Sequence, residues 1–458
     1  MFTNISKIKM WSKVISAIQN KHFLSLAGNG IMIILSMITT AIIFRALPIS
    51  RAGEWGFFQA TFLLIDTFRS GFITTAFIKF YAGSDEKRTA EVAGSTWFVA
   101  LIITGILVAL NLPALFLAKY ITDDGLLLFI KWFGLAYLFT LPMFMATCVL
   151  QGEQRFDQLL YVRFVNRGSF ILFIIVLIIM KKMSLETLLY AYLISNLITS
   201  IYVMLMGWSR IGTLAKRSKA SMMEIYNFGK YSVGTTLSSN MFRTSDTYII
   251  NFMLGPAALA IYNLGQSLMQ LVEVPLVSFA ATGMPILSAH YNQGNREGVI
   301  HTMKKYIGML TLILLPACII ACLLADFAIG LIGGGKYVHT EAANVFRLFM
   351  TFALLYPADR FSALTLDVIH RPQVNFYKVL VMLAANIIFD YLGILVLGNV
   401  YGVAVTTVVP VLIAVIISYI ELNKYQKYSF WNIYSVGFYE TKLLFKQVMA
   451  MIRPSSAG

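Results

Sequence analysis

Charged residues lie inside the long apolar segments of this chain, where a charge is costly and therefore informative about chemistry. Asp66 and Arg69 are three residues apart in one such segment, and Arg243 and Asp246 repeat the spacing in another. Residues three apart share one face of a helix. Each pair therefore has two open interpretations: an ion pair that locks neighbouring helices, or a polar surface that meets a charged substrate.

Two arginines and a lysine form a second candidate site. Arg163 and Arg167 are four apart, hence on one helix face, and Lys378 follows Arg163 at an offset of 215 that also relates Pro142 to Pro357. A guanidinium group presents a fork of donors that matches phosphate, so this face is a candidate anion site. The alternative is that the side chains reach toward lipid phosphates, which suits Arg163 better than Arg167.

One carboxylate is a candidate for ion coupling. Glu273 lies two residues before Pro275 within an apolar segment. A buried carboxylate beside a helix break could carry a coupling proton or sodium ion, and the alternative is a salt bridge to a neighbouring helix.

The balance of charge inside the apolar segments favours an anionic substrate. A cavity that selects cationic drugs or sodium would show an excess of acidic groups, whereas here basic residues outnumber acidic ones, eleven to eight. The basic residues are Arg45, Arg69, Lys79, Lys131, Arg163, Arg167, Lys230, Arg243, Arg347, Arg360 and Lys378. The acidic residues are Asp66, Asp246, Glu273, Asp326, Asp359, Asp367, Asp390 and Glu421.

The sequence contains no motif for catalysis, a cofactor or a metal. No phosphate-binding loop occurs, and the glycines at 333–335 are not followed by Lys-Ser or Lys-Thr. Cys318 and Cys322 share a helix face, but no histidine or second cysteine pair joins them, so we interpret them and Cys148 as small packing residues. We expect a protein that is not an enzyme and that uses no cofactor.

The segments that position these residues are long and apolar. The chain has 458 residues, of which 58% are hydrophobic and 12% charged, and a soluble domain would carry about 25% charged residues. Each segment is long enough to cross a hydrocarbon layer of about 30 Å as a helix. We predict an all-α polytopic membrane protein with twelve spans, at 23–46, 56–80, 92–118, 126–150, 158–180, 187–208, 226–254, 257–283, 303–333, 342–369, 374–397 and 401–422.

The distribution of lysine and arginine predicts orientation and domains. With both termini in the cytoplasm, inner segments hold twenty basic residues and outer loops five, as the positive-inside rule requires. The net charge of +15 thus reflects orientation, and we expect no nucleic-acid partner. The predicted domains are an amphipathic cytoplasmic segment at 1–22, an N-lobe at 23–208, a basic linker at 209–225, a C-lobe at 226–422 and a cytoplasmic tail at 423–458.

The two predicted lobes share weak internal similarity, and their motifs resemble a known family. The sequence is similar to polysaccharide transporters, the lipid-linked oligosaccharide (O-antigen type) flippases of the multidrug/oligosaccharidyl-lipid/polysaccharide (MOP) exporter superfamily. The resemblance covers nearly the whole chain. Its motifs lie at 45–48, 53–56, 246–255, 260–263, 285–288, 294–295, 315–316 and 335–337.

The resemblance implies a MATE-like (MOP) fold of two pseudo-symmetric six-helix lobes around a cavity that alternates between the two membrane faces. It implies a polyprenyl-diphosphate-linked oligosaccharide as substrate, membrane lipids and glycan polymerase or ligase proteins as partners, and a bacterial cytoplasmic membrane as location. On this basis Arg69, Arg243, Asp66, Asp246 and Glu273 become the preferred cavity residues, and we expect Arg69 and Arg243 to face water and bind the diphosphate.

Other functions fit the sequence less well. Drug and cation antiporters of the same superfamily usually carry acidic residues in the first helix, and 23–46 has none. Lipid II flippases have two C-terminal helices beyond the twelve spans that this sequence predicts. A membrane scaffold for a glycan-assembly complex stays open as an alternative, whereas a membrane glycosyltransferase or ligase would need an acidic catalytic motif and usually a large external loop.

Overall fold

The computed structural model describes residues 21–452, and within this range it describes the side chains of all but 21–29, 444–445 and 447–452. The predicted amphipathic segment at 1–22 lies almost entirely outside the described residues. The described chain is helical throughout and contains no strand. It divides into two compact units, unit 1 (Met1–Thr244) and unit 2 (Ser245–Gly458), and each is treated by itself.

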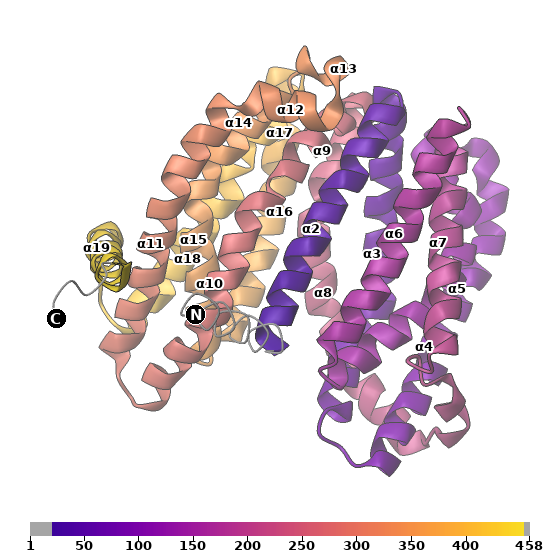
Figure 1. The fold of residues 1–458 in the computed structure, drawn as a ribbon, viewed down its shortest axis with the longest axis horizontal. Coiled ribbons are helices and arrows are strands. Elements are labelled where there is room, and N and C mark those ends of the chain that lie inside the picture. The colour runs from indigo at the N-terminus through magenta and orange to yellow at the C-terminus, as the bar shows by residue number, and fades with distance from the viewer. Residues whose placement is uncertain (1–20, 453–458) are drawn as a thin grey trace, which may run out of the picture. The chain divides into compact units, whose positions relative to one another are not determined.

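Unit 1 is a bundle of long helices joined by short turns (Figure 1). Side-chain caps fix several helix starts: Asp85 accepts from the Arg88 N–H at 2.7 Å, and Ser184 forms a capping box with Thr187. The elements are α2 (Lys21–Ala46), α3 (Ile49–Tyr81), α4 (Glu86–Leu117), η1 (Ala118–Tyr120), α5 (Asp124–Gly152), α6 (Phe156–Ile179), α7 (Leu185–Leu205), η2 (Ile211–Lys216) and the first part of α8 (Lys219–Leu254).

Unit 2 contains the end of α8 and more frequent helix breaks than unit 1. Gly255 has φ of +87°, a conformation that favours glycine, and Pro256 then occupies the first turn of α9. The following elements are α9 (Pro256–Leu268), α10 (Gln270–Asn292), α11 (Arg296–Leu323), α12 (Ala325–Gly333), α13 (Gly335–Val338), α14 (Ala342–Phe352), η3 (Ala353–Leu355), α15 (Tyr356–Val368), α16 (Pro372–Leu397), α17 (Val400–Thr406), α18 (Val408–Tyr425) and α19 (Asn432–Ile452).

The helices confirm an all-α polytopic membrane protein. In the described range, nine helical segments are long and apolar enough to cross a membrane, and 30–46 of α2 forms a shorter apolar helix. The two other predicted spans, at 226–254 and 342–369, are helical as well, in α8 and in α14 to α15. Both are more polar, because α8 carries Lys230, Arg243 and Asp246, and α15 carries Asp359 and Arg360.

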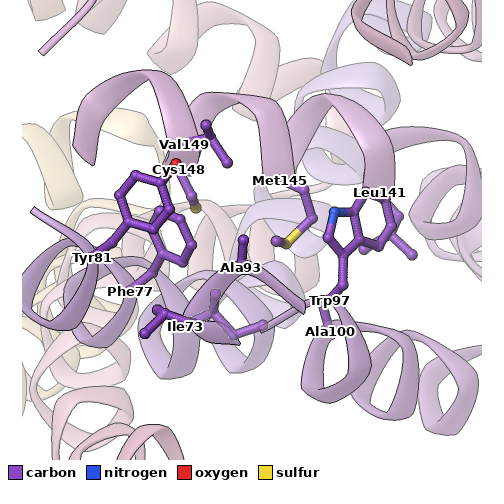
Figure 2. Close-up of a cluster of buried hydrophobic side chains, with 11 residues drawn as sticks. Ile73, Phe77, Tyr81, Ala93, Trp97, Ala100, Leu141, Met145, Cys148 and Val149 are labelled. Atoms are coloured by element: carbon purple, nitrogen blue, oxygen red, sulfur yellow. The ribbon is translucent and has the colours of Figure 1, made fainter. Parts of the chain in front are cut away.

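A core of apolar side chains fixes α3, α4 and α5 against one another, and so holds the part of α3 that carries charge. The indole Nε1 of Trp97 donates to the Ser209 carbonyl at 2.6 Å, which ties this core to the start of the predicted linker. Figure 2 shows the cluster, which comprises Ile73, Phe77, Tyr81, Val92, Ala93, Trp97, Ala100, Leu141, Met145, Cys148 and Val149.

The predicted linker at 209–225 contains η2 and the start of α8, and it lies in unit 1. The first part of α8 packs on α3: Asn240 donates to the Thr67 hydroxyl at 2.7 Å, and a Cβ on Gly71 would lie 2.9 Å from Thr236. The division into an N-lobe at 23–208 and a C-lobe at 226–422 stays a prediction.

Candidate functional site

Asp66 and Arg69 form an ion pair within α3, which is one of the two interpretations that their spacing allowed. Arg69 Nη2 lies 2.7 Å from Asp66 Oδ1, and the same guanidinium donates to the Tyr137 carbonyl and the Thr140 hydroxyl of α5, both at 3.0 Å. The guanidinium carbon Cζ of Arg69 also lies over the Phe144 ring, 4.8 Å from its centre. These contacts use donors on both terminal nitrogens, so Arg69 joins α3 to α5.

The expectation that Arg69 faces water is wrong. Arg69 is 2% exposed to solvent, whereas the Asp66 side chain is 19% exposed. The reason is that α5 offers a carbonyl and a hydroxyl at the height of Arg69, and these groups bind the guanidinium more closely than an open cleft would allow. Only its partner Asp66 reaches partly toward the surface.

Arg163 and Arg167 lie half-buried on α6, beside a polar strip shared with α7. Asn166, between them, donates to Asn196 at 3.0 Å and to Thr199 at 3.3 Å. Arg167, Asp66 and Arg69 all lie within electrostatic reach of the Tyr192 hydroxyl of α7. Unit 1 therefore gathers basic groups from α3 and α6 around one polar region.

The second predicted pair, Arg243 with Asp246, does not form. Arg243 is exposed, and in the described range no ion pair joins it to Asp246. Both oxygens of Asp246 are occupied: Oδ2 accepts from the Tyr262 hydroxyl and Oδ1 from the Asn386 amide. The aspartate therefore points into unit 2, and the guanidinium is left at the surface of α8.

Asp246 belongs instead to a carboxylate pair with Asp390. The Asn386 side chain lies between them, donating to Asp246 Oδ1 and to Asp390 Oδ2 at 2.8 Å. Asp390 Oδ1 accepts from the Thr406 hydroxyl at 2.9 Å, and the Ser245 hydroxyl lies 3.1 Å from the same amide nitrogen. We name these five residues the carboxylate site of unit 2.

Helix packing explains why these side chains meet. Asn386 and Asp390 are four apart on α16, hence on one face. One turn beyond Asp390, the backbones of α16 and α17 touch: a Cβ on Gly393 would lie 2.3 Å from the Gly402 carbonyl oxygen. Only glycine permits such an approach, and it brings Thr406, four residues after Gly402, against Asp390.

The carboxylate site is buried and lacks a basic partner. Asp390 is 0% exposed, Asn386 2% and Asp246 8%. Across residues 21–452, neither carboxylate has a salt bridge to lysine or arginine. Two buried negative charges in contact are strongly unfavourable, so the site requires a shared proton or a bound cation.

The donor set indicates which cation suits the site. The Asn386 amide nitrogen carries two hydrogens but lies within hydrogen-bond distance of three acceptor oxygens, so one of the three contacts lacks a proton. A protonated carboxylate would supply the missing proton, and a bound cation facing the amide oxygen would replace the contact. Carboxylate, hydroxyl and amide oxygens are hard ligands. No group of three or more His, Cys, Asp or Glu side chains suited to a metal ion occurs in the described part of the chain.

The remaining predicted residues lie elsewhere in unit 2. Lys378 is 3% exposed and its Nζ lies 2.9 Å from Asp359 of α15, so it joins α15 to α16. Glu273 is exposed on α10, four residues after the helix break at Met269, and it forms no ion pair among the described residues. Tyr356 lies within electrostatic reach of Glu273, Asp359 and Asp246.

Sequence reasoning missed Asp390 and Asn386 as site residues. The available signal was their spacing of four within a span that has a single acidic residue. Nothing local indicated that this face meets Asp246, which lies 140 positions before Asn386 in the chain.

Comparison with known proteins places these features in a family. Residues 56–342 match a family described as polysaccharide biosynthesis protein. A probable low-salt glycan biosynthesis flippase, Agl15 of Haloferax volcanii, is 22% identical over 285 residues, or 61% of this chain and 58% of that protein. The match therefore spans less than two thirds of that relative.

Solved structures share the fold at low identity. An inward-facing multidrug resistance MATE family transporter of the MOP superfamily has a TM-score of 0.74 and 17% identity, covering 86% of this chain and 96% of its own. The lipid II flippase MurJ in an inward closed conformation has a TM-score of 0.72 and 14% identity, and the match covers 95% of this chain and 94% of MurJ. A MOP superfamily transporter from Pyrococcus furiosus has a TM-score of 0.59 and 15% identity, and the match covers 90% of this chain and 96% of that transporter. These likenesses confirm the predicted MATE-like fold.

Proposed function

The chain belongs to the polysaccharide biosynthesis protein family, and we propose that it is a flippase that moves a polyprenyl-diphosphate-linked oligosaccharide across the membrane by alternating access. A likeness to a glycan biosynthesis flippase supports the proposal. The observation that carries it is the opposite charge of the two units.

Charge inside the apolar segments is divided between the units. Eight of the eleven basic residues fall in unit 1, whose segments hold a single acidic residue, Asp66. Seven of the eight acidic residues fall in unit 2. Since intramembrane charge persists where it has a task or a partner, we assign the anionic headgroup to unit 1 and a coupling cation to unit 2.

Within unit 1, we assign the diphosphate to Arg167, Arg163 and Arg243. Arg167 and Arg163 are half-buried on one face of α6, and Arg243 is exposed on α8. Each guanidinium can offer two parallel donors to a phosphate. Arg69 acts differently, since its contacts with α5 hold Asp66 in place rather than leaving donors free for substrate.

Within unit 2, the carboxylate site is the proposed coupling site for a proton or sodium ion. A cation that moves down a potential of 100 mV releases about 2.3 kcal/mol, enough to drive a substrate gradient of roughly fiftyfold. Glu273 is a second coupling candidate because it is a carboxylate without an ion pair in the described range. Lys378, paired with Asp359, is assigned to holding α15 and α16 together.

The proposal includes a location and partners. We propose a bacterial cytoplasmic membrane with both termini in the cytoplasm, where the nascent lipid-linked glycan is made. Glycan polymerase or ligase proteins would receive the product on the outer side. ATP hydrolysis by the chain itself is not required, because a cation gradient supplies the energy.

A reconstituted flipping assay tests the function. Proteoliposomes receive a fluorescent short-chain polyprenyl-diphosphate disaccharide, and its exposure in each leaflet is measured with a sodium gradient, a proton gradient or neither. We expect one gradient to accelerate flipping, Asp390→Asn to abolish that acceleration, and Asp326→Asn to leave it intact. Asp326 is a suitable control because its side chain is 59% exposed and paired with Arg347.

The same assay separates the competing functions. The acidic excess of unit 2 also suits an antiporter for organic cations, in which case ethidium rather than the lipid-linked sugar would move against the gradient. A membrane scaffold would move neither compound under any gradient. Either result would contradict the proposed flippase.

A further inference from the structure

The last helix, α19, is fixed to α11 by direct backbone contact. A Cβ on Gly437 would lie 2.4 Å from the Cα of Gly308, and one on Gly308 would lie 2.4 Å from the Ile433 carbonyl oxygen. Any side chain at either glycine would force the helices apart. Figure 1 shows α19 viewed nearly along its axis while α11 runs across the view, so the two helices cross steeply.

A salt bridge fixes the rotation of α19 about its own axis. Glu440 lies 2.5 Å from Lys305 Nζ through one oxygen and 3.5 Å from His301 Nε2 through the other. The hydrogen bond from Lys305 and the nearby His301 hold the pKa of Glu440 below its usual value. Glu440 is three residues after Gly437, so both contacts mark the same face of α19.

The opposite face of α19 carries exposed aromatic and basic side chains. Trp431 just before the helix is 76% exposed, and Phe438 and Tyr439 are each 62% exposed. Lys442 and Lys446 are exposed on the same side, at spacings of four and eight from Phe438. Aromatic side chains and lysines in this combination are typical of helices at the membrane–water interface.

The crossing point on α11 indicates the depth of α19. The first third of α11 is polar and contains Arg296, Lys304 and Lys305, and an apolar stretch follows from Ile307. Gly308 therefore lies where α11 enters the hydrocarbon layer. A helix that crosses α11 steeply at this level lies along the membrane surface.

The segment between α18 and α19 adds a basic cleft at the same end of unit 2. The cleft is about 680 Å³ and is lined by residues that include Tyr419, Lys424 and Lys427. Phe430 packs edge-to-face against Tyr419 with ring centres 5.9 Å apart, which ties the cleft to the start of α19. Lys427 is exposed, and its positive charge suits a phosphate headgroup.

We propose that α19 is an interfacial helix whose outward face, formed by Trp431, Phe438, Tyr439, Lys442 and Lys446, binds anionic phospholipids. The lysines meet lipid phosphates, and the aromatic rings lie at the boundary between headgroups and acyl chains. The Gly308–Gly437 crossing transmits this attachment to α11. The proposal is independent of the transported substrate.

Hydrogen–deuterium exchange of the full-length protein in lipid nanodiscs tests the proposal. Amide exchange in residues 430–452 is compared between discs of phosphatidylcholine alone and discs that also contain phosphatidylglycerol. We expect the anionic lipid to slow exchange about tenfold, since each lysine near an anionic surface contributes a severalfold effect. The double variant Lys442→Glu/Lys446→Glu should lose this dependence.

A matched variant controls for the change of charge. Lys181→Glu/Lys182→Glu makes the same change in the turn after α6, where both lysines are exposed, and it should keep the lipid dependence of α19. Equal exchange in both kinds of disc would overturn the proposal, and so would lipid dependence that survives Lys442→Glu/Lys446→Glu. Gly437→Leu should speed exchange in α19 without removing its response to anionic lipid, and a loss of that response would also count against the proposal.

Discussion

Replacing Arg69 by methionine tests whether this residue joins helices or binds substrate. Arg69→Met keeps an unbranched apolar stem in the site but removes the guanidinium that contacts Asp66, the Tyr137 carbonyl and Thr140. It leaves the Asp66 carboxylate without its partner. Breaking a buried ion pair by removing one partner costs about 3–5 kcal/mol, and partial exposure of Asp66 places the loss near the lower end.

A loss of about 3 kcal/mol corresponds to a fall in Tm on the order of 3–6 °C. Thermal unfolding in detergent, followed by tryptophan fluorescence, measures it. Asp66→Leu/Arg69→Met removes both charges and should regain most of the stability, because a buried pair replaced by apolar groups is often nearly neutral. Arg155→Met is the control, since the Arg155 side chain is 44% exposed and lies 3.4 Å from Glu153, which keeps its hydrogen bonds from Tyr81 and Arg210, so the loss should be at most about 1 kcal/mol.

Thermal unfolding and lipid flipping, measured together, separate the two roles of Arg69. If Arg69→Met unfolds at the wild-type temperature yet no longer flips lipid-linked sugar, then its donors serve the substrate. A double variant that stays as unstable as Arg69→Met would show that lost packing, rather than an unpaired charge, is the cause.

Three further predictions concern orientation, helix packing and pH. Cysteines introduced at Lys216 and Lys336 should react with impermeant reagents from the cytoplasmic and the outer side respectively, and the reverse pattern would contradict the predicted topology. Gly308→Leu should lower Tm more than Gly212→Leu, because a Cβ at Gly308 meets the α19 backbone whereas Gly212 has open space; equal effects would exclude the close crossing. Burial alone would raise the pKa of Glu153, but hydrogen bonds from Tyr81 and Arg210, both at 2.8 Å, lower it overall. A carboxylate whose pKa is lower in the folded than in the unfolded protein stabilises the fold above its unfolded-state pKa, and this stability is lost as the pH falls through its folded-state pKa. Glu153→Gln should therefore lower Tm at neutral pH and make the fall of Tm in acid less steep. An unchanged fall of Tm in acid would contradict this.

Local patterns predicted the helices and the interactions within a helix. Apolar segments longer than a membrane crossing indicated the all-helical fold, and a spacing of three placed Asp66 and Arg69 on one helix face, where an ion pair was one of two interpretations. The same rule failed for Arg243 and Asp246, because Tyr262 and Asn386 from other helices bind the aspartate first. Spacing shows which groups can meet, but competing partners from distant segments decide which do.

The carboxylate site could not be predicted because it depends on tertiary packing. Asp246, Asp390 and Thr406 come from three helices, and the contact between Gly393 and Gly402 that brings two of them together is not visible in any local pattern. The total charge also concealed the site. Eleven basic and eight acidic residues suggested one cavity for an anionic substrate, whereas most basic residues lie in unit 1 and most acidic ones in unit 2.

The central claim is that the carboxylate site of unit 2 binds the coupling cation, and ligand-dependent thermal unfolding tests it most directly. Tm is measured against sodium at constant ionic strength, and against pH without sodium, for the wild type, Asp390→Asn and Asp326→Asn. Sodium at about 100 times Kd would stabilise the wild type by about 2.7 kcal/mol, or acidification would stabilise it if the cation is a proton. We predict that Asp326→Asn keeps the response of the wild type and that Asp390→Asn loses it. A wild type that responds to neither cation, or an Asp390→Asn variant that responds as fully as the wild type, would contradict the claim.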